Sequence, residues 1–249
     1  KKNEICNIIY KKVKSNHPLF ILFTSGTTGV PKGTIHSTAG YLVYTKYTSI
    51  KQFGINKTSK ILTASDAGWM NGHTYALYGP LSIGATTIII EKPMSLLSEE
   101  LLKKILFKFR VNILYLPVTL IRLLKAINSK KKIKSSYLKT LGSMGEPLSK
   151  HIGSWFSSRY SRKKLQIVNT FYQTETGAII ASPKYSDSIK DVPFGTVGKP
   201  VNNYLGVFLD RQKEEKAEIK IKNPWPGCMI GIVNGKKVYN QYWDKKKNF

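Results

Sequence analysis

Short apolar runs alternate with longer amphipathic stretches between residues 18 and 171. The apolar runs predict strands over 18–24, 60–65, 85–90, 111–116, 138–144 and 166–171, with a short return strand over 33–36. Apolar residues at helical spacing predict helices over 37–53, 74–83, 98–110, 118–127 and 149–160. Because strand and helix alternate with short links, we expect an α/β fold whose sheet is mostly parallel and is flanked by helices. The uniformly apolar run Leu19–Phe23 is interpreted as a buried strand of that sheet.

The pattern changes after Gly177, where the helical periodicity stops. Runs over 205–209, 217–221 and 229–233 predict strands, so the last third of the chain is expected to be β-rich. Residues 1–16 are polar and basic and are interpreted as a linker.

Charge raises the question of nucleic-acid binding, since 40 basic and 14 acidic residues give a net charge of +26. The basic residues are scattered in short clusters, and no aromatic-plus-basic strand motif of RNA-binding modules is present. We therefore interpret the charge mainly as solvated surface, and nucleic-acid binding ranks third among the functions considered. No apolar run approaches the roughly 18 residues of a membrane span, which predicts a soluble protein.

The most informative stretch is the loop Thr24–Gly33, which contains three glycines, four hydroxyl side chains and Lys32. Glycines let backbone N–H groups converge on an anion, hydroxyls add donors and lysine adds a point charge. This loop therefore predicts a polyphosphate site, although its residues around Lys32 do not fit the Walker A pattern. The alternative is a flexible polar surface loop.

Other polar loops follow predicted strands at 66–73, 145–147 and 172–177. In open α/β sheets ligands bind beyond the carboxyl ends of the strands. We therefore expect these loops and the 24–33 loop to form one site.

The loops also carry a resemblance to a known family. The segments Thr24–Gly33 and Tyr172–Gly177 resemble the signature pair of the adenylate-forming acyl-CoA synthetase superfamily. The segments Asp66–His73, Leu77–Leu81, Val111–Tyr115 and Gly142–Pro147 make the chain similar to AMP-forming acetyl-CoA synthetases (acetate–CoA ligases). The similarity runs from about Pro18 to Gly177 and, more weakly, through Asn223–Gly227. It implies that residues 1–249 are a fragment of the large N-terminal AMP-binding (adenylation) domain of such an enzyme.

This resemblance implies a two-step reaction in which ATP and acetate give acetyl-adenylate and pyrophosphate, and coenzyme A then takes the acetyl group. The implied partners are these small molecules and the rest of a longer chain, with no specific nucleic acid and no membrane. The implied catalytic residues are Thr27, Lys32, Thr174 and Glu175, and Glu175 helps to hold Mg²⁺. The implied ATP-binding residues are Thr24, Ser25, Gly26, Thr27, Thr28, Gly29, Lys32, Gly145, Glu146, Pro147, Asn169, Thr170, Phe171, Tyr172, Gln173 and Thr174.

The resemblance further implies an acyl pocket walled by Trp69, Met70, Asn71, Met144 and Tyr172, with Asn71 also contacting coenzyme A. The family usually has tryptophan at Tyr172, valine at Met70 and Met144, threonine at Asn71 and aspartate at Asn169. Tyrosine is smaller than tryptophan and methionine is larger than valine, so the pocket is expected to be reshaped at similar volume. Acetate is the expected acid, with propionate as an alternative.

Several family segments have no counterpart in these residues: an N-terminal portion with coenzyme A contacts, a ribose-binding Gly-Asp segment, a hinge and a C-terminal domain with a catalytic lysine. We therefore expect negligible synthetase activity from residues 1–249 alone. The alternatives are an adenylating ligase for a longer acid or an amino acid, and an inactive fragment that acts as a binding protein. The expected compartment is the cytoplasm, with the nucleus as a second location.

Overall fold

The computed structural model describes residues 10–24, 31–127, 132–213, 216–233, 235–244 and 247–249. Five of the predicted ATP-binding residues, Ser25, Gly26, Thr27, Thr28 and Gly29, lie outside the described residues. The described part of the 1–16 segment contains no helix or strand.

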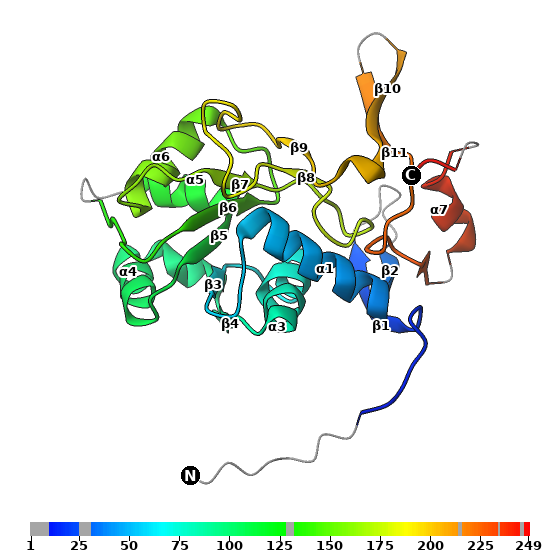
Figure 1. The fold of residues 1–249 in the computed structure, drawn as a ribbon, viewed down its shortest axis with the longest axis horizontal. Coiled ribbons are helices and arrows are strands. Elements are labelled where there is room, and N and C mark those ends of the chain that lie inside the picture. The colour runs from blue at the N-terminus through cyan, green and yellow to red at the C-terminus, as the bar shows by residue number, and fades with distance from the viewer. Residues whose placement is uncertain (1–9, 25–30, 128–131, 214–215, 234, 245–246) are drawn as a thin grey trace.

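The centre of the fold is a five-stranded parallel sheet in the order β4-β3-β5-β6-β7 (Figure 1). Its strands are β3 (Lys60–Thr63), β4 (Thr86–Ile88), β5 (Ile113–Pro117), β6 (Thr140–Met144) and β7 (Ile167–Asn169). The helices between them are α3 (Gly79–Ile83), α4 (Glu99–Lys108), α5 (Val118–Ala126) and α6 (Lys150–Tyr160), and α1 (Thr38–Phe53) leads from β2 into β3. The predicted parallel α/β sheet is thereby confirmed, with strands shorter than the apolar runs that predicted them.

Alternate residues of the central strands face two different core clusters, as strand geometry requires. Ile61, Ile113 and Tyr115 belong to a cluster with Phe53 of α1. Their neighbours Leu62, Leu114 and Leu116 belong to a second cluster that contains residues of α4, α5 and α6. Both faces of the sheet are therefore buried at β3 and β5, which explains the apolar runs in these strands.

The segment after β3 differs from the prediction of a loop over 66–73. Helix α2 (Met70–His73) begins inside that loop and runs directly into a π-helical turn, η1 (Thr74–Tyr78), and then α3. A Cβ atom on Gly79 would lie 2.3 Å from Oγ of Ser49. The lack of a side chain at Gly79 therefore allows α3 to approach α1 closely.

The prediction that Leu19–Phe23 is a buried strand of the parallel sheet is wrong. Strand β1 (Pro18–Thr24) pairs antiparallel with β2 (Lys32–Ser37), and β2 pairs antiparallel with β12 (Gly231–Ile232), in a separate sheet. Leu22 is buried, whereas Ile21 and Phe23 are exposed. An apolar run does not reveal whether a strand is covered on one face or on two.

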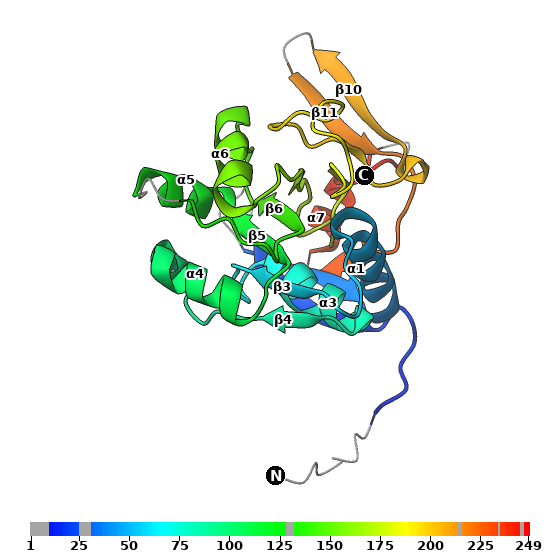
Figure 2. The same cartoon turned by 60° about the vertical axis from the view of Figure 1, so that its left-hand side comes forward.

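The C-terminal third contains antiparallel strands, as predicted, but the prediction that helices stop after Gly177 is wrong. Besides the short strands β8 (Ala181–Ser182) and β9 (Lys199–Pro200), it contains the hairpin of β10 (Val207–Lys213) and β11 (Lys216–Ile221). Figure 2 shows this hairpin projecting from the body. A helix, α7 (Lys236–Gln241), follows, and two 3₁₀ turns, η2 (Pro93–Leu97) and η3 (Asn203–Leu205), complete the elements.

Helix α7 has no fully buried residue, but Val238 and Tyr239 are partly buried against the core. The prediction that helices stop after Gly177 overlooked this short apolar face. Within the part of the chain that the structure describes, every helix is too short or too polar to cross a membrane.

Candidate active site

A cavity of about 680 Å³ lies where the parallel sheet meets the antiparallel sheet. Three of its walls follow the carboxyl ends of β3, β6 and β7, which is the usual ligand position in an α/β sheet. Its lining residues are Thr24, Lys32, Trp69, Met70, Asn71, Gly145, Glu146, Pro147, Asn169, Thr170, Phe171, Tyr172, Gln173, Thr174, Glu175, Gly195, Val197 and Tyr242. The structure thus brings together every described site residue that the sequence predicted, except Met144.

The predicted polyphosphate loop reaches the cavity in a different way from the other loops. Thr24 and Lys32 are directly opposed residues of the β1–β2 pair, so both ends of the loop stand at the cavity. The prediction that this loop leaves a strand of the parallel sheet is wrong, because it joins two antiparallel strands. The Nζ atom of Lys32 lies 5.5 Å from the ring centre of Tyr242.

The loop 172–177 is held by contacts with the C-terminal part of the chain. The indole N–H of Trp225 donates to the carbonyl of Thr176 (3.0 Å), and the N–H of Met229 donates to the carbonyl of Glu175 (2.9 Å). Within the loop, the N–H of Gln173 donates to Oγ1 of Thr176 (3.0 Å). These bonds fix the backbone that presents Thr174 and Glu175 to the cavity.

His36 supports the same loop from β2. Its Nε2 lies 2.8 Å from the carbonyl oxygen of Thr174, and the side chain is buried. Burial lowers the pKa of His36 from 6.5 to about 4, because the charged ring would lose its hydration. His36 is therefore neutral near pH 7 and supplies no positive charge to the site.

The turn Gly145–Pro147 lines the cavity, and Gly145 has a φ of +87°, which a residue with a side chain rarely adopts. The carboxylate of Glu146 accepts hydrogen bonds from Oγ1 of Thr119 and from Nη1 of Arg122, the latter at 2.9 Å. These bonds tie the turn to α5, so its backbone has a fixed position at the cavity wall.

Asn169 and Thr170, at the end of β7, bond to other parts of the protein. Oγ of Ser143 donates to Oδ1 of Asn169 (3.0 Å), and Nδ2 of Asn169 donates to the carbonyl of Thr196 (2.9 Å). Oγ1 of Thr170 lies 2.7 Å from the hydroxyl oxygen of Tyr115 and donates to the carbonyl of Ser143 (2.9 Å). This part of the wall is therefore shaped before a ligand binds.

The predicted acyl pocket is only partly assembled as expected. The cavity is lined by Trp69, Met70, Asn71 and Tyr172. The rings of Tyr172 and Tyr75 are nearly perpendicular, with their centroids 5.7 Å apart. Burial, reinforced by nearby Tyr115, raises the pKa of Tyr172 well above its usual value, so this phenol stays neutral.

Met144 differs from this group because it is buried in the core under the sheet and does not line the cavity. Its side chain can influence the pocket only through the residues that pack on it.

Sequence reasoning missed three lining residues: Gly195, Val197 and Tyr242. The glycine pair 195 and 198 was a turn signal, but nothing in the sequence connected it with the cavity. Tyr242 follows α7, and the hydroxyl of Tyr242 donates to Oε1 of Glu175 (2.7 Å).

The donor set suits magnesium bound together with a polyphosphate. Mg²⁺ commonly binds through one or two carboxylates, with the remaining ligands from phosphates and water. Glu175 supplies one carboxylate at the cavity, next to Thr174. Among the described residues, no group of three or more His, Cys, Asp or Glu side chains is placed to hold a metal ion by itself.

Comparison with solved structures supports the fold. The crystal structure of the anthranilate CoA ligase AuaEII in complex with anthranoyl-AMP matches with a TM-score of 0.76 at 17% identity. The match covers 94% of this chain and 44% of that one. At this identity the match shows a shared fold.

Sequence comparison identifies closer relatives. Acetyl-coenzyme A synthetase 1 of Debaryomyces hansenii is 36% identical over 230 residues, which are 89% of this chain and 34% of that protein. Acetyl-coenzyme A synthetase of Methylorubrum populi is 35% identical over 244 residues, covering 95% and 37%. The chain therefore spans about a third of the length of these relatives. Residues 4–232 match the family described as AMP-binding enzyme, and the chain belongs to that family.

Proposed function

We propose that this chain forms the nucleotide- and acid-binding part of an adenylate-forming ligase that activates a short carboxylic acid, with acetate as the preferred acid. The observation that carries the proposal is the single cavity lined by Lys32, by Thr174 and Glu175, and by the apolar wall around Met70. Such a cavity offers a cation, hydroxyl donors and a carboxylate that can bind a metal ion, beside an apolar wall. These groups are suited to the reaction of a carboxylic acid with the α-phosphate of ATP.

The chemistry explains why the charges have to be arranged in this way. Attack of a carboxylate on the α-phosphate of ATP brings two anions together, and pyrophosphate leaves with the negative charge. Mg²⁺ on the phosphates would neutralise part of this charge when bound. In this chain Lys32 and Thr174 would hold phosphate oxygens, and Glu175 would hold the ion.

The turn Gly145–Pro147 and the end of β7 are proposed to hold the adenosine part. Both are backbone segments fixed by bonds to the protein, and Phe171 offers an aromatic ring beside them. Because these walls are already ordered, they lose little conformational entropy when they bind a rigid base.

The choice of acetate rests on the packing of the apolar wall and on the relatives. Tyr172 packs against Tyr75 and against the apolar cluster that contains Met70. The relatives described above are named acetyl-coenzyme A synthetases. Propionate is the second candidate, since it is larger by only one methylene.

Transfer of the acyl group to coenzyme A is proposed for a protein that contains this chain, with Asn71 as a contact. The relatives are about three times as long as this chain. Residues 1–249 alone are therefore expected to bind nucleotide with little or no ligase activity, and the cytoplasm is the proposed compartment.

Calorimetric titration of the 249-residue chain tests the proposal. The ligands are MgATP and non-hydrolysable sulfamoyl analogues of acetyl-, propionyl- and hexanoyl-adenylate. We expect the acetyl analogue to bind most tightly, and Lys32→Ala or Glu175→Gln to weaken MgATP binding by about tenfold or more. Lys222→Ala is the control, because Lys222 is exposed and does not line the cavity. Absence of MgATP binding, or equal affinity for the three analogues, would contradict the proposal.

A further inference from the structure

Tyr242 touches both charged groups that the proposed function assigns to the phosphates and the metal. Its hydroxyl donates to Oε1 of Glu175 at 2.7 Å, and the ammonium of Lys32 lies over its ring, 5.5 Å from the centre. Glu175 comes from the loop after β7 and Lys32 from the start of β2. One phenol from the C-terminal part of the chain therefore joins groups from the two sheets.

We propose that Tyr242 is a positioning residue that orients the Glu175 carboxylate toward a nucleotide-bound divalent cation and holds Lys32 beside it. This inference rests on the proposed function, because it assigns Tyr242 a role toward the same nucleotide.

The hydrogen bond to Glu175 carries the first half of the inference. A carboxylate that binds a metal has two oxygens, and a donor on one of them fixes which way the other points. A tyrosine side chain is ordinarily protonated at neutral pH, so the phenol of Tyr242 can act as the donor in this bond.

The ring of Tyr242 carries the second half. An ammonium over an aromatic face is attracted by the electron-rich ring, without the charge cancellation that a carboxylate partner would cause. Lys32 can thus be held in place while its charge remains available for an anion. This arrangement suits a lysine that has to meet a polyphosphate.

Tyr242 is itself held by the end of the described chain. Its ring is stacked with that of Phe249 (centroids 5.7 Å apart, planes at 18°). The backbone of Phe249 exchanges two hydrogen bonds with Ile221 of β11, at 2.7 and 2.9 Å.

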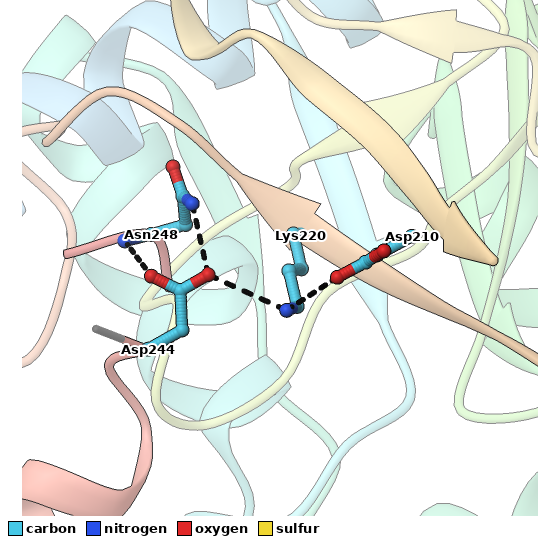
Figure 3. Close-up of polar contacts among 4 residues, drawn as sticks. All are labelled: Asp210, Lys220, Asp244 and Asn248. Carbon is cyan, nitrogen blue, oxygen red and sulfur yellow. Dashed lines mark hydrogen bonds and ion pairs between the residues drawn. The ribbon is translucent and has the colours of Figure 1, made fainter. Parts of the chain in front are cut away.

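A polar cluster anchors the same segment to the hairpin (Figure 3). The Nζ atom of Lys220 pairs with Asp210 of β10 at 2.6 Å and with Asp244 at 3.3 Å. Asp244 also accepts two hydrogen bonds from Asn248, each at 2.9 Å. The position of Tyr242 is therefore set by contacts of Asp244, Asn248 and Phe249, which follow it in the chain.

The test is a magnesium titration of the ATP complex of the 249-residue chain. Tyr242→Phe keeps the ring over which Lys32 lies and removes the hydroxyl that bonds Glu175. We expect the magnesium concentration needed for half-saturation to rise about tenfold, with unchanged ATP affinity when magnesium is absent. Tyr242→Leu also removes the ring and should weaken ATP binding with and without magnesium.

Two controls separate positioning from a general structural effect. Tyr239→Phe removes a hydroxyl from α7, the helix just before Tyr242, at a residue that does not line the cavity, and should leave the titration unchanged. In a Glu175→Gln background, Tyr242→Phe should add little further loss, because the two changes remove the same interaction.

The outcomes are distinct. If the wild-type chain binds no MgATP, both the proposed function and this inference are contradicted. If the wild-type chain binds MgATP and Tyr242→Phe needs no more magnesium, only the inference is overturned. If Tyr242→Phe does not fold, the test is NMR spectroscopy of the wild-type chain, labelled with tyrosine that is isotopically enriched at Cζ. The Tyr242 signal should then shift when magnesium is added to the ATP complex, and an unmoved signal would overturn the inference.

Discussion

Several polar side chains around the cavity are bonded within the protein before a ligand binds. Asn169 bonds with Ser143 and Thr196, and Glu146 bonds with Thr119 and Arg122. Bonds of this kind reduce the conformational entropy that these side chains would otherwise lose when a ligand binds. The cavity wall is therefore suited to recognise shape, while Lys32 and Glu175 supply the charges.

Tyr172 is expected to limit the length of the acid. Tyr172→Gly removes the ring that packs against Tyr75 and should thereby enlarge the space beside Met70. We expect preference for the hexanoyl over the acetyl adenylate analogue to rise by about tenfold or more, since one methylene in a pocket is worth roughly ten- to 200-fold. Competition binding measures this ratio.

Tyr204→Gly is the matched control, because Tyr204 is exposed and lies outside the cavity. It should leave the preference unchanged. An unchanged preference in Tyr172→Gly, with thermal unfolding that shows a folded variant, would disprove the pocket assignment.

His36 should make stability depend on pH between about 4 and 6.5. Its pKa is 6.5 as a free side chain and about 4 in the fold, so in this window the unfolded chain binds the additional proton. The free energy of unfolding therefore loses this contribution as pH falls from 6.5, by up to ~3 kcal/mol at pH 4. Urea unfolding at several pH values should show a flatter profile for His36→Gln than for the wild type.

The exposed His17 provides the control for this experiment, and His17→Gln should follow the wild-type profile. A His36→Gln profile that runs parallel to the wild type between pH 4 and 6.5 would show that His36 is not the group responsible.

At the scale of elements, the close approach of the loop 172–177 to the loop 225–228 depends on Gly177. Gly177 has a φ of +76°, and a Cβ atom there would lie 2.1 Å from the carbonyl oxygen of Gly227. Gly145 has a similar φ of +87°, but a Cβ atom there would meet nothing within 4 Å. Comparing a substitution at Gly145 with one at Gly177 therefore distinguishes the cost of backbone strain from the cost of steric overlap.

We expect Gly145→Ala to lower the free energy of unfolding by about 1–2 kcal/mol through backbone strain alone. Gly177→Ala should cost at least ~2 kcal/mol more, because two backbone segments have to move apart. Chemical denaturation of both variants measures the difference. Equal losses would mean that the loops separate without cost.

The elements also show what the sequence could predict. The strands of the parallel sheet are apolar on both faces, as at Ile61 and Leu62, so their runs were recognised together with the helices between them. The same reasoning failed at β1, where Ile21 and Phe23 are apolar but exposed. It also failed at α7, a helix of six residues whose apolar side chains Val238 and Tyr239 are only partly buried.

The candidate site was predicted in the same uneven way. The position of the loops after β6 and β7 at the carboxyl ends of predicted parallel strands indicated one site, and the structure brings these loops together at one cavity. Tyr242 could not be predicted, because its contact with Glu175 depends on how the C-terminal segment packs on β11. Long-range packing of this kind leaves no periodic signal in the sequence.

On the scale of the whole molecule, positive charge dominates. The sequence has 40 basic and 14 acidic residues. In the described part of the chain, ion pairs join Lys220 to Asp210 and Asp244, Arg122 to Glu146, and Arg159 to Glu99. Excess charge of one sign favours expansion of the chain and also attracts anions such as nucleotides.

Salt should therefore stabilise the fold while weakening nucleotide binding. Raising NaCl from about 0.01 M to about 0.1 M shortens the screening length from about 30 Å to about 10 Å, which reduces repulsion between distant lysines. We expect the melting temperature at pH 7 to rise by a few degrees and MgATP affinity to fall over the same range. Sodium bromide should act like sodium chloride if screening is the cause, whereas a specific anion site would distinguish the two salts. A melting temperature that stays constant or falls would show that the excess charge is too dispersed to affect stability.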